Sequence, residues 1–180
     1  MGKYKHGKQL REMTKEEFYQ HVESGNFVKF SHKVFLILLY YVGCRVTEAL
    51  RLTRDKFKVT KSIVYAEIKA EKGGIQRPAF ELNRSLPYVE LLVKRVEAVQ
   101  DNKLVFPFNR VTGWLIVKRA CGENFYPHFF RLNRTVKFLN NPQVTLDEIR
   151  QWMAWKSIDT VNNYLGYSER TIGKLSQEIS

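Results

Sequence analysis

The hydrophobic residues of this chain recur mostly three and four positions apart, which is the spacing of one face of an α-helix. Residues 31–42 are instead almost wholly apolar, a pattern typical of a helix buried in the core. The predicted helices cover residues 14–23, 31–42, 47–52, 86–99, 111–120, 128–139 and 145–155, and further helical segments run through Tyr164 and from 168 onward. A mainly helical fold is therefore expected.

Polar residues and glycines mark where several of these helices begin and end. Thr14 with Glu17 forms a capping-box pattern, and Thr145 precedes two acidic residues that suit a helix N-terminus. Ser31 is predicted to cap the apolar helix, and Gly43 to end it.

One short region has the period of β-structure. Residues 63–68 are rich in β-formers and partly alternate, and residues 78–82 follow after Gly73 and Gly74. This pattern predicts a hairpin whose turn carries Lys72. The fold class expected is mainly α with a small antiparallel β-sheet (α+β), and residues 1–180 are expected to form a single domain because no linker or repeat interrupts them.

Composition and charge narrow the function classes. The chain has 180 residues, of which 44% are hydrophobic and 13% aromatic, so it can fill a core and is not a disordered basic tail. The longest apolar run, residues 35–42, is too short to span a bilayer, and the N-terminus lacks an apolar signal core. Cys44 and Cys121 are too few for a disulfide framework or a zinc site. A cytoplasmic, soluble domain is expected.

The charge points to a polyanionic partner. Thirty Lys and Arg against eighteen Asp and Glu give a net charge of +12. Such a surplus is usually tolerated where a polyanion shares the surface. No basic amphipathic helix with a clean apolar face is present to bind a membrane, so nucleic acid is the expected partner.

The sequence favours phosphoryl transfer without a metal over metal-dependent chemistry. The chain has no Walker-type glycine loop, no H-E-x-x-H motif and no carboxylate pair at obvious metal spacing. Metal-free transfer needs fixed cations for the phosphate oxygens, a nucleophile and a proton donor, and arginine suits the first role because its planar fork grips two oxygens. Composition alone does not choose among thirty cations.

Two short patterns occur in the first half of the chain. Residues 43–52 read G-C-R-V-T-E-A-L-R-L directly after the apolar helix, which places Arg45 and Glu48 three residues apart. Residues 71–74 then read E-K-G-G in the predicted hairpin, with Lys72 ahead of two glycines.

Two more patterns follow in the second half. His128 and Arg131 form an H-F-F-R sequence on a predicted helix, immediately after Pro127. Trp155 then precedes Tyr164 by nine residues.

This ordered set resembles the tyrosine recombinases, the family of phage and archaeal-virus integrases. The family has a G-x-R-x-x-E-x-x-x-L box, a β-hairpin lysine, an H-x-x-R box, and a His or Trp nine residues before its nucleophilic tyrosine. The resemblance covers roughly residues 31–167. Leu132 stands where a His often follows the H-x-x-R box, and Met153-Ala154 replaces the usual Leu-Gly. These departures favour a divergent branch, such as the archaeal viral or plasmid integrases, and the length leaves no room for the family's separate DNA-binding domains.

The resemblance implies the following roles. Arg45 and Arg131 clamp the scissile phosphate, and Tyr164 attacks phosphorus. Lys72 donates a proton to the departing 5′ oxygen, although Lys69 is a near competitor for that role. A free tyrosine has a pKa of about 10, so nearby positive charge or a base must help it to lose its proton.

The remaining box residues support these groups. His128 is expected to hydrogen-bond the phosphate or to help move the tyrosine proton, and Trp155 to pack beside the phosphate with its indole N–H as a donor. Glu48, one helical turn from Arg45, is expected to orient the site rather than to do chemistry.

The implied reaction is site-specific DNA recombination through a 3′-phosphotyrosine intermediate, as in the integration of a viral genome or mobile element. The intermediate conserves the phosphodiester energy, so neither a metal nor a nucleotide cofactor is needed. The partner is double-stranded DNA at attachment sites, with self-association as a tetramer, no membrane and no small-molecule substrate. Two alternatives remain: a type IB topoisomerase, which reseals the same strand, and a non-catalytic basic DNA-binding module. Whether Tyr164 serves its own site or a neighbour's also stays open.

Overall fold

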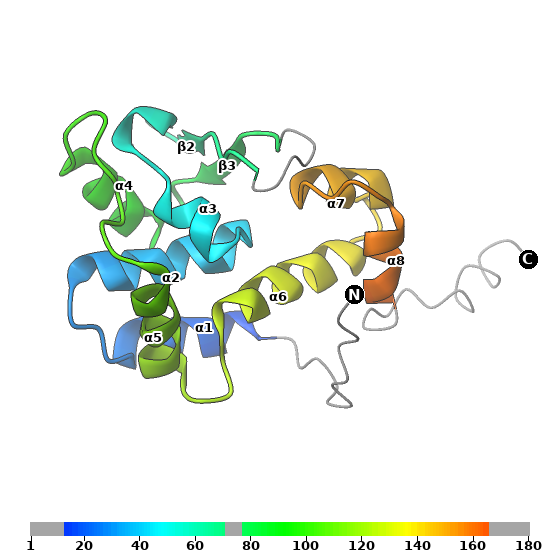
Figure 1. Ribbon diagram of the computed structural model, residues 1–180, viewed down its shortest axis with the longest axis horizontal. Helices are drawn as coiled ribbons and strands as arrows, with labels where there is room; N and C mark the ends of the chain where they lie inside the picture. The colour runs from blue at the N-terminus through cyan, green and yellow to red at the C-terminus, as the bar shows by residue number, and fades with distance from the viewer. Residues whose placement is uncertain (1–12, 71–76, 166–180) are drawn as a thin grey trace, which may run out of the picture.

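The computed structural model describes residues 13–70 and 77–165. The elements are α1 (Lys15–Ser24), α2 (Phe30–Val42), α3 (Val46–Leu50), a 3-10 turn η1 (Arg54–Lys56), β1 (Phe57–Val59), β2 (Ile63–Ala66), β3 (Phe80–Asn83), α4 (Val89–Glu97), α5 (Arg110–Cys121), α6 (Pro127–Leu139), α7 (Leu146–Trp152) and α8 (Asp159–Leu165). The predicted fold class, mainly helical with a small antiparallel sheet, is confirmed (Figure 1).

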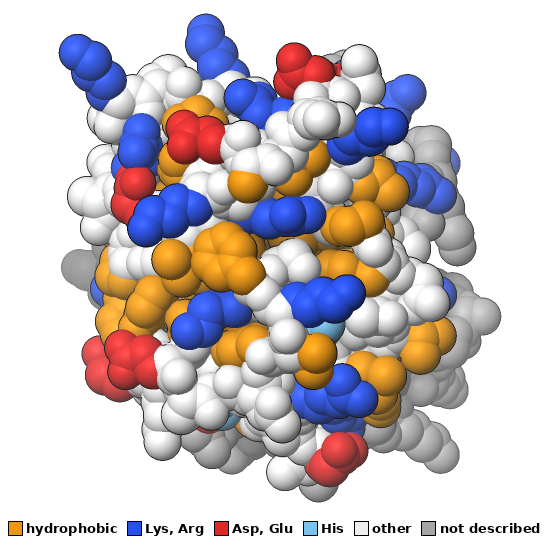
Figure 2. Space-filling view, turned by 90° about the vertical axis from the view of Figure 1, so that its left-hand side faces the viewer, with side chains coloured by type: hydrophobic (Ala, Val, Ile, Leu, Met, Phe, Trp, Pro, Cys, Tyr) orange, Lys and Arg blue, Asp and Glu red, His pale blue; other side chains and the backbone are white. Residues whose placement is uncertain are grey.

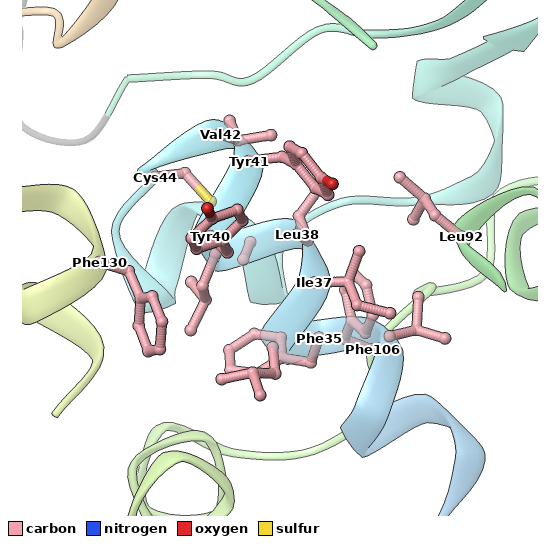
Figure 3. Packing of buried hydrophobic residues seen from close by; sticks show 14 of the residues in the cluster. Phe35, Ile37, Leu38, Tyr40, Tyr41, Val42, Cys44, Leu92, Phe106 and Phe130 are labelled. Atoms are coloured by element: carbon pink, nitrogen blue, oxygen red, sulfur yellow. The ribbon is translucent and has the colours of Figure 1, made fainter. Parts of the chain in front are cut away.

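Helix α2 is the centre of the core. It packs against α1, α3, α4, α5 and α6, and its side chains from Val34 to Val42 are all buried. Figure 3 shows α2 meeting Leu92 of α4, Phe106 of the loop before α5, and Phe130 of α6. An almost wholly apolar sequence suits such a position because every face of the helix has a neighbour. The end of α2 is therefore held firmly, and the segment that follows it carries Arg45.

The sheet has one strand more than the sequence indicates. Strands β2 and β3 form the predicted antiparallel pair, with Val64 opposite Leu82, and β1 adds a third antiparallel strand with Phe57 opposite Ala66. Side chains alternate between core and solvent along β3, where Phe80 and Leu82 are buried. The hairpin turn with Lys72, Gly73 and Gly74 lies outside the described residues.

Most of the predicted helix ends are confirmed. The Thr14 hydroxyl accepts the backbone N–H of Glu17, and Thr145 forms a reciprocal capping box at the start of α7. Gly43 ends α2 in the left-handed conformation with φ of 63°, which glycine adopts without strain. The Ser31 cap is wrong: the extended Lys29 is the N-cap, its carbonyl accepts the N–H of His32, and Ser31 lies within the helix.

Helices α7 and α8 pack against α6 and against each other (Figure 1). The prediction that α7 reaches Trp155 is wrong by three residues: the helix ends at Trp152, and Ala154 has a positive φ of 49°. This turn reverses the chain, so Trp155 packs into a second small core with Ile149, Met153 and Val161. Among the described residues, no helix is long and apolar enough to cross a bilayer.

Candidate active site

Arg45 and Glu48 are joined by the start of α3. Arg45 is the N-cap of the helix; its backbone N–H donates to Glu48 Oε2 at 2.8 Å, and its Nη1 donates to Glu48 Oε1 at 2.6 Å. The Glu48 side chain is 1% exposed, whereas that of Arg45 is 34% exposed. The carboxylate thus holds Arg45 in place, while about a third of the Arg45 side chain remains exposed to solvent.

Two further arginines face the same carboxylate. Arg77 Nη1 lies 3.4 Å from Glu48 Oε2, and Arg131 Nη1 lies 3.9 Å from the same oxygen. Burial by itself raises the pKa of Glu48, but the backbone N–H of Arg45 and the surrounding guanidinium charges outweigh it, so the pKa is lowered. Glu48 is therefore ionised at neutral pH and supplies one negative charge to three positive ones.

Arg131 is the most enclosed of the predicted site residues, with a side chain that is 2% exposed. Its Nη1 donates to the carbonyl of Gly43 at 3.0 Å, and its Nη2 donates to the carbonyl of Met153. Burial and the charge of Arg45 lower its pKa to about 10, so it keeps its charge at neutral pH. Arg131 is a fixed cation tied to the segment before Arg45 and to the segment before Trp155.

Trp155 packs on Arg131, and Tyr164 packs on Trp155. The guanidinium carbon of Arg131 lies 5.5 Å from the Trp155 ring centroid. The Trp155 and Tyr164 rings are stacked in parallel, with centroids 5.1 Å apart and an interplanar angle of 7°. In this structure Tyr164 thus stacks on Trp155 of its own chain, and that ring in turn packs on Arg131.

His128 lies one helical turn before Arg131 on α6, at the helix N-terminus that Pro127 begins. Burial, followed by the positive charges of Arg131 and Arg45, lowers its pKa to about 4. The imidazole is consequently neutral at pH 7 in the free protein, able to donate one hydrogen bond and to accept another.

The fold thus brings together five of the six predicted site residues, from α3, α6, α8 and the turn after α7. These are Arg45, His128, Arg131, Trp155 and Tyr164. Lys72 lies outside the described residues, and Lys69 is an exposed residue beyond β2, so the choice between these two lysines stays open. The chemical role of each residue stays a prediction. Within the described ranges no three His, Cys, Asp or Glu side chains are grouped as metal ligands.

Two residues next to the site were not predicted from the sequence as part of it. Arg77 is buried and donates from Nη2 to the Val42 carbonyl at 2.8 Å. Trp152 donates from Nε1 to the same carbonyl at 3.1 Å, and the Arg77 guanidinium carbon lies 5.5 Å from its ring centroid. In the sequence Arg77 is one of thirty cations, and only its position shortly after the Lys72 pattern distinguishes it.

The sequence also matches a known protein family. Residues 8–170 match the phage integrase family. The chain belongs to this family. A search of curated proteins gives no match.

Solved structures of integrases and recombinases have a similar fold. XerH site-specific recombinase, bound to palindromic difH substrate in a post-cleavage complex, matches with a TM-score of 0.70 and 16% identity over 94% of this chain and 53% of that chain. XerA recombinase matches with a TM-score of 0.64 and 19% identity over 93% of this chain and 63% of that chain. A λ integrase dimer bound to a COC′ core site matches with a TM-score of 0.60 and 16% identity over 89% and 49%.

At these identities the solved structures establish the integrase fold of the chain, which spans 53% of the XerH chain and 63% of the XerA chain. They do not distinguish an archaeal branch from others, so that assignment stays a prediction.

Proposed function

We propose that this chain is the catalytic domain of a site-specific DNA recombinase that cleaves and rejoins DNA through a 3′-phosphotyrosine. The observation that carries the proposal is the continuous series of contacts from Arg45 through Glu48 and Arg131 to Trp155 and Tyr164. This series connects two permanent cations with one phenol through the Trp155 ring, which supports the proposal. A phosphodiester needs this combination when no metal takes part.

The proposed reaction has two balanced steps. The phenol oxygen of Tyr164 attacks the scissile phosphorus and gives up its proton, the bond from phosphorus to the 5′ oxygen breaks, and that oxygen takes up a proton to become a free hydroxyl. In the second step a 5′ hydroxyl of a partner duplex attacks the phosphorus and gives up its proton, the bond from phosphorus to the tyrosine oxygen breaks, and the Tyr164 oxygen takes up a proton. The bond energy is retained in the tyrosine ester, and Lys72 remains our candidate donor for the departing 5′ oxygen.

The two arginines differ in how they meet the phosphate. Arg45 has the more exposed side chain and is suited to bind a non-bridging oxygen directly. Arg131 is held by two backbone carbonyls and supplies a charge that does not reorganise during the reaction. The neutral His128 beside it is suited to exchange a proton with the phosphate or the phenol.

The charge of the molecule supports duplex DNA as the substrate. Lys and Arg side chains extend well away from the site: Figure 2 shows a different face of the protein, with many basic side chains interspersed among hydrophobic ones. With a net charge of +12, the protein attracts a polyanion from many directions. XerH and λ integrase have been solved on DNA, the latter as a dimer. We accordingly propose self-association on attachment-site DNA, in the cytoplasm of a host cell.

A covalent adduct tests the proposal. Duplexes of random sequence, each nicked in one strand so that the short fragment bearing the free 5′ hydroxyl diffuses away after cleavage, are incubated with the protein and run on a denaturing gel. The wild type should give a labelled band at the mass of protein plus DNA, and Tyr164→Phe should give none. Tyr126→Phe is the matched control, because Tyr126 is an exposed tyrosine at the N-cap of α6. The Tyr126→Phe protein should form the adduct as the wild type does.

Each alternative gives a different result. If no adduct forms with either protein while DNA still binds, the chain is a basic DNA-binding module. If adducts form and supercoiled plasmid is relaxed but two trapped duplexes never exchange strands, the activity is that of a topoisomerase. Exchange between two duplexes recovered from the adduct band supports recombination.

A further inference from the structure

Arg77 occupies a junction between three elements that carry the proposed site. Its Nη2 donates to the Val42 carbonyl, the last residue of α2 before the segment leading to Arg45. Its Nη1 lies 3.4 Å from Glu48 of α3, and its guanidinium packs on Trp152, the last residue of α7. Trp152 donates to the same Val42 carbonyl, so the end of α2 is bound from two sides.

The burial of Arg77 is hard to explain by stability alone. Its side chain is 1% exposed, and among the described residues its Nε, which is buried, has no hydrogen-bond partner. A buried charge with an unsatisfied donor costs free energy, and an apolar residue of the same volume is often tolerated as well or better at such a place. Arg134 has an equally buried Nε without a hydrogen-bond partner in the part of the chain that the structure describes, so the feature that distinguishes Arg77 is its contact with Glu48 in the proposed site.

We propose that Arg77 is a positioning residue for the strand-cleavage reaction, an inference that rests on the proposed function. It does not touch DNA, because it is buried. Instead it contacts Glu48 Oε2, which also accepts the Arg45 backbone N–H, and it binds the end of α2, so that Arg45 and Arg131 keep one spacing around the carboxylate. Only a planar guanidinium spans the Glu48 oxygen and the Val42 carbonyl at the same time.

The test measures single-turnover cleavage and DNA affinity separately, using the nicked duplexes selected by the wild type. Arg77→Met should lower the cleavage rate constant by about tenfold or more while the dissociation constant for the duplex changes by less than about twofold. The cleavage rate constant of Arg77→Lys should lie between those of the wild type and Arg77→Met, because lysine keeps the charge but reaches only one acceptor. In a Glu48→Gln protein, adding Arg77→Met should lower the cleavage rate constant little further, because both substitutions break the same network.

Arg134→Met is the matched control. Arg134 also donates to a carbonyl of α2, that of Tyr40 at 2.8 Å, and packs on aromatic rings, but no contact joins it to Glu48 among the described residues. Arg134→Met should leave the cleavage rate constant of the folded protein unchanged, whatever its effect on the melting temperature. Circular dichroism of each variant at the assay temperature establishes that it is folded.

Three results would overturn the inference. Arg77→Met could cleave at the wild-type rate, it could lose activity only in proportion to its unfolded fraction as Arg134→Met does, or its loss could add fully to that of Glu48→Gln. If Arg77→Met does not fold, a Lys variant with wild-type cleavage overturns the bridging role and a slower one supports it. A wild type that forms no adduct refutes the proposed function itself, whereas an active wild type with normal Arg77 variants refutes only this inference.

Discussion

Replacing Glu48 by Gln removes the one negative charge among Arg45, Arg77 and Arg131. The glutamine keeps the size of the side chain and one oxygen acceptor, but its amide N–H₂ then faces guanidinium donors. The carboxylate that it replaces accepts bonds at 2.8 and 2.6 Å from Arg45 and lies 3.4 Å from Arg77. The substitution therefore leaves buried positive charge without compensation.

The expected cost in folding stability is large. Removing one partner of a buried ion pair typically costs about 3–5 kcal/mol. Arg45 is partly exposed and the amide oxygen still accepts one hydrogen bond, so we expect the low end, about 3 kcal/mol. That loss corresponds to roughly a hundredfold increase in the unfolding equilibrium constant.

Chemical denaturation at pH 7 measures this cost, with Glu90→Gln as the control. Glu90 accepts two bonds from Arg84, at 2.6 and 2.8 Å, but its side chain is 48% exposed, so water replaces the lost interaction. Glu48→Gln should lower the free energy of unfolding far more than Glu90→Gln does. Because the folded-state pKa of Glu48 is lowered, its contribution is present above its ordinary value of 4.5 and is lost as the pH falls further, and the gap between the wild type and Glu48→Gln should narrow there. Equal losses for the two variants at pH 7 would refute the view that Glu48 organises the site.

Three further outcomes are expected. Arg131→Met should lower the cleavage rate by about a hundred- to thousandfold, or roughly 3–4 kcal/mol, through loss of a transition-state cation, and near-wild-type cleavage by folded protein would contradict its role. The free energy of unfolding should fall as the pH drops from 6.5 toward 4, because the pKa of His128 in the folded protein is lowered to about 4. His128→Asn should show a flatter dependence of unfolding free energy on pH. An unchanged dependence would argue against burial of a neutral imidazole. Gly43→Ala should cost about 1–3 kcal/mol, because φ is 63° and the added Cβ lies 2.9 Å from Arg134 Cβ, and a melting temperature equal to that of the wild type would show that the turn relaxes freely.

The sequence predicted helices well where the apolar period is long or the cap is chemically explicit. Helices α1 and α7 begin at Thr14 and Thr145 as predicted, because a threonine hydroxyl satisfies a backbone N–H that the helix leaves free. The strand β1 was missed because three residues with one fully buried side chain carry too little periodicity to detect. Ser31 was misplaced because the Lys29 carbonyl starts the helical hydrogen bonds earlier, and this depends on the preceding turn.

In the candidate site, too, one part was predicted from the sequence and another was not. Motif spacing singled out Arg45, His128, Arg131, Trp155 and Tyr164, and the fold brings them together, although their chemical roles remain predictions. Spacing does not reveal what surrounds such residues. The contacts of Arg77 with Val42 and Glu48 span 35 and 29 residues of chain. They arise because the segment before β3 and the last residue of α7 both meet the end of α2, and no local pattern encodes that meeting.

In the proposed reaction Arg45, Arg131 and the ring of residue 164 meet at one phosphorus atom. A crystal structure of Tyr164→Phe bound to a duplex selected by the wild-type protein would show whether they do. We expect a single phosphate whose non-bridging oxygens accept hydrogen bonds from both guanidinium groups, with the ring of residue 164 beside its phosphorus. Guanidinium groups on two different phosphates, or a residue-164 ring turned away from both, would contradict it.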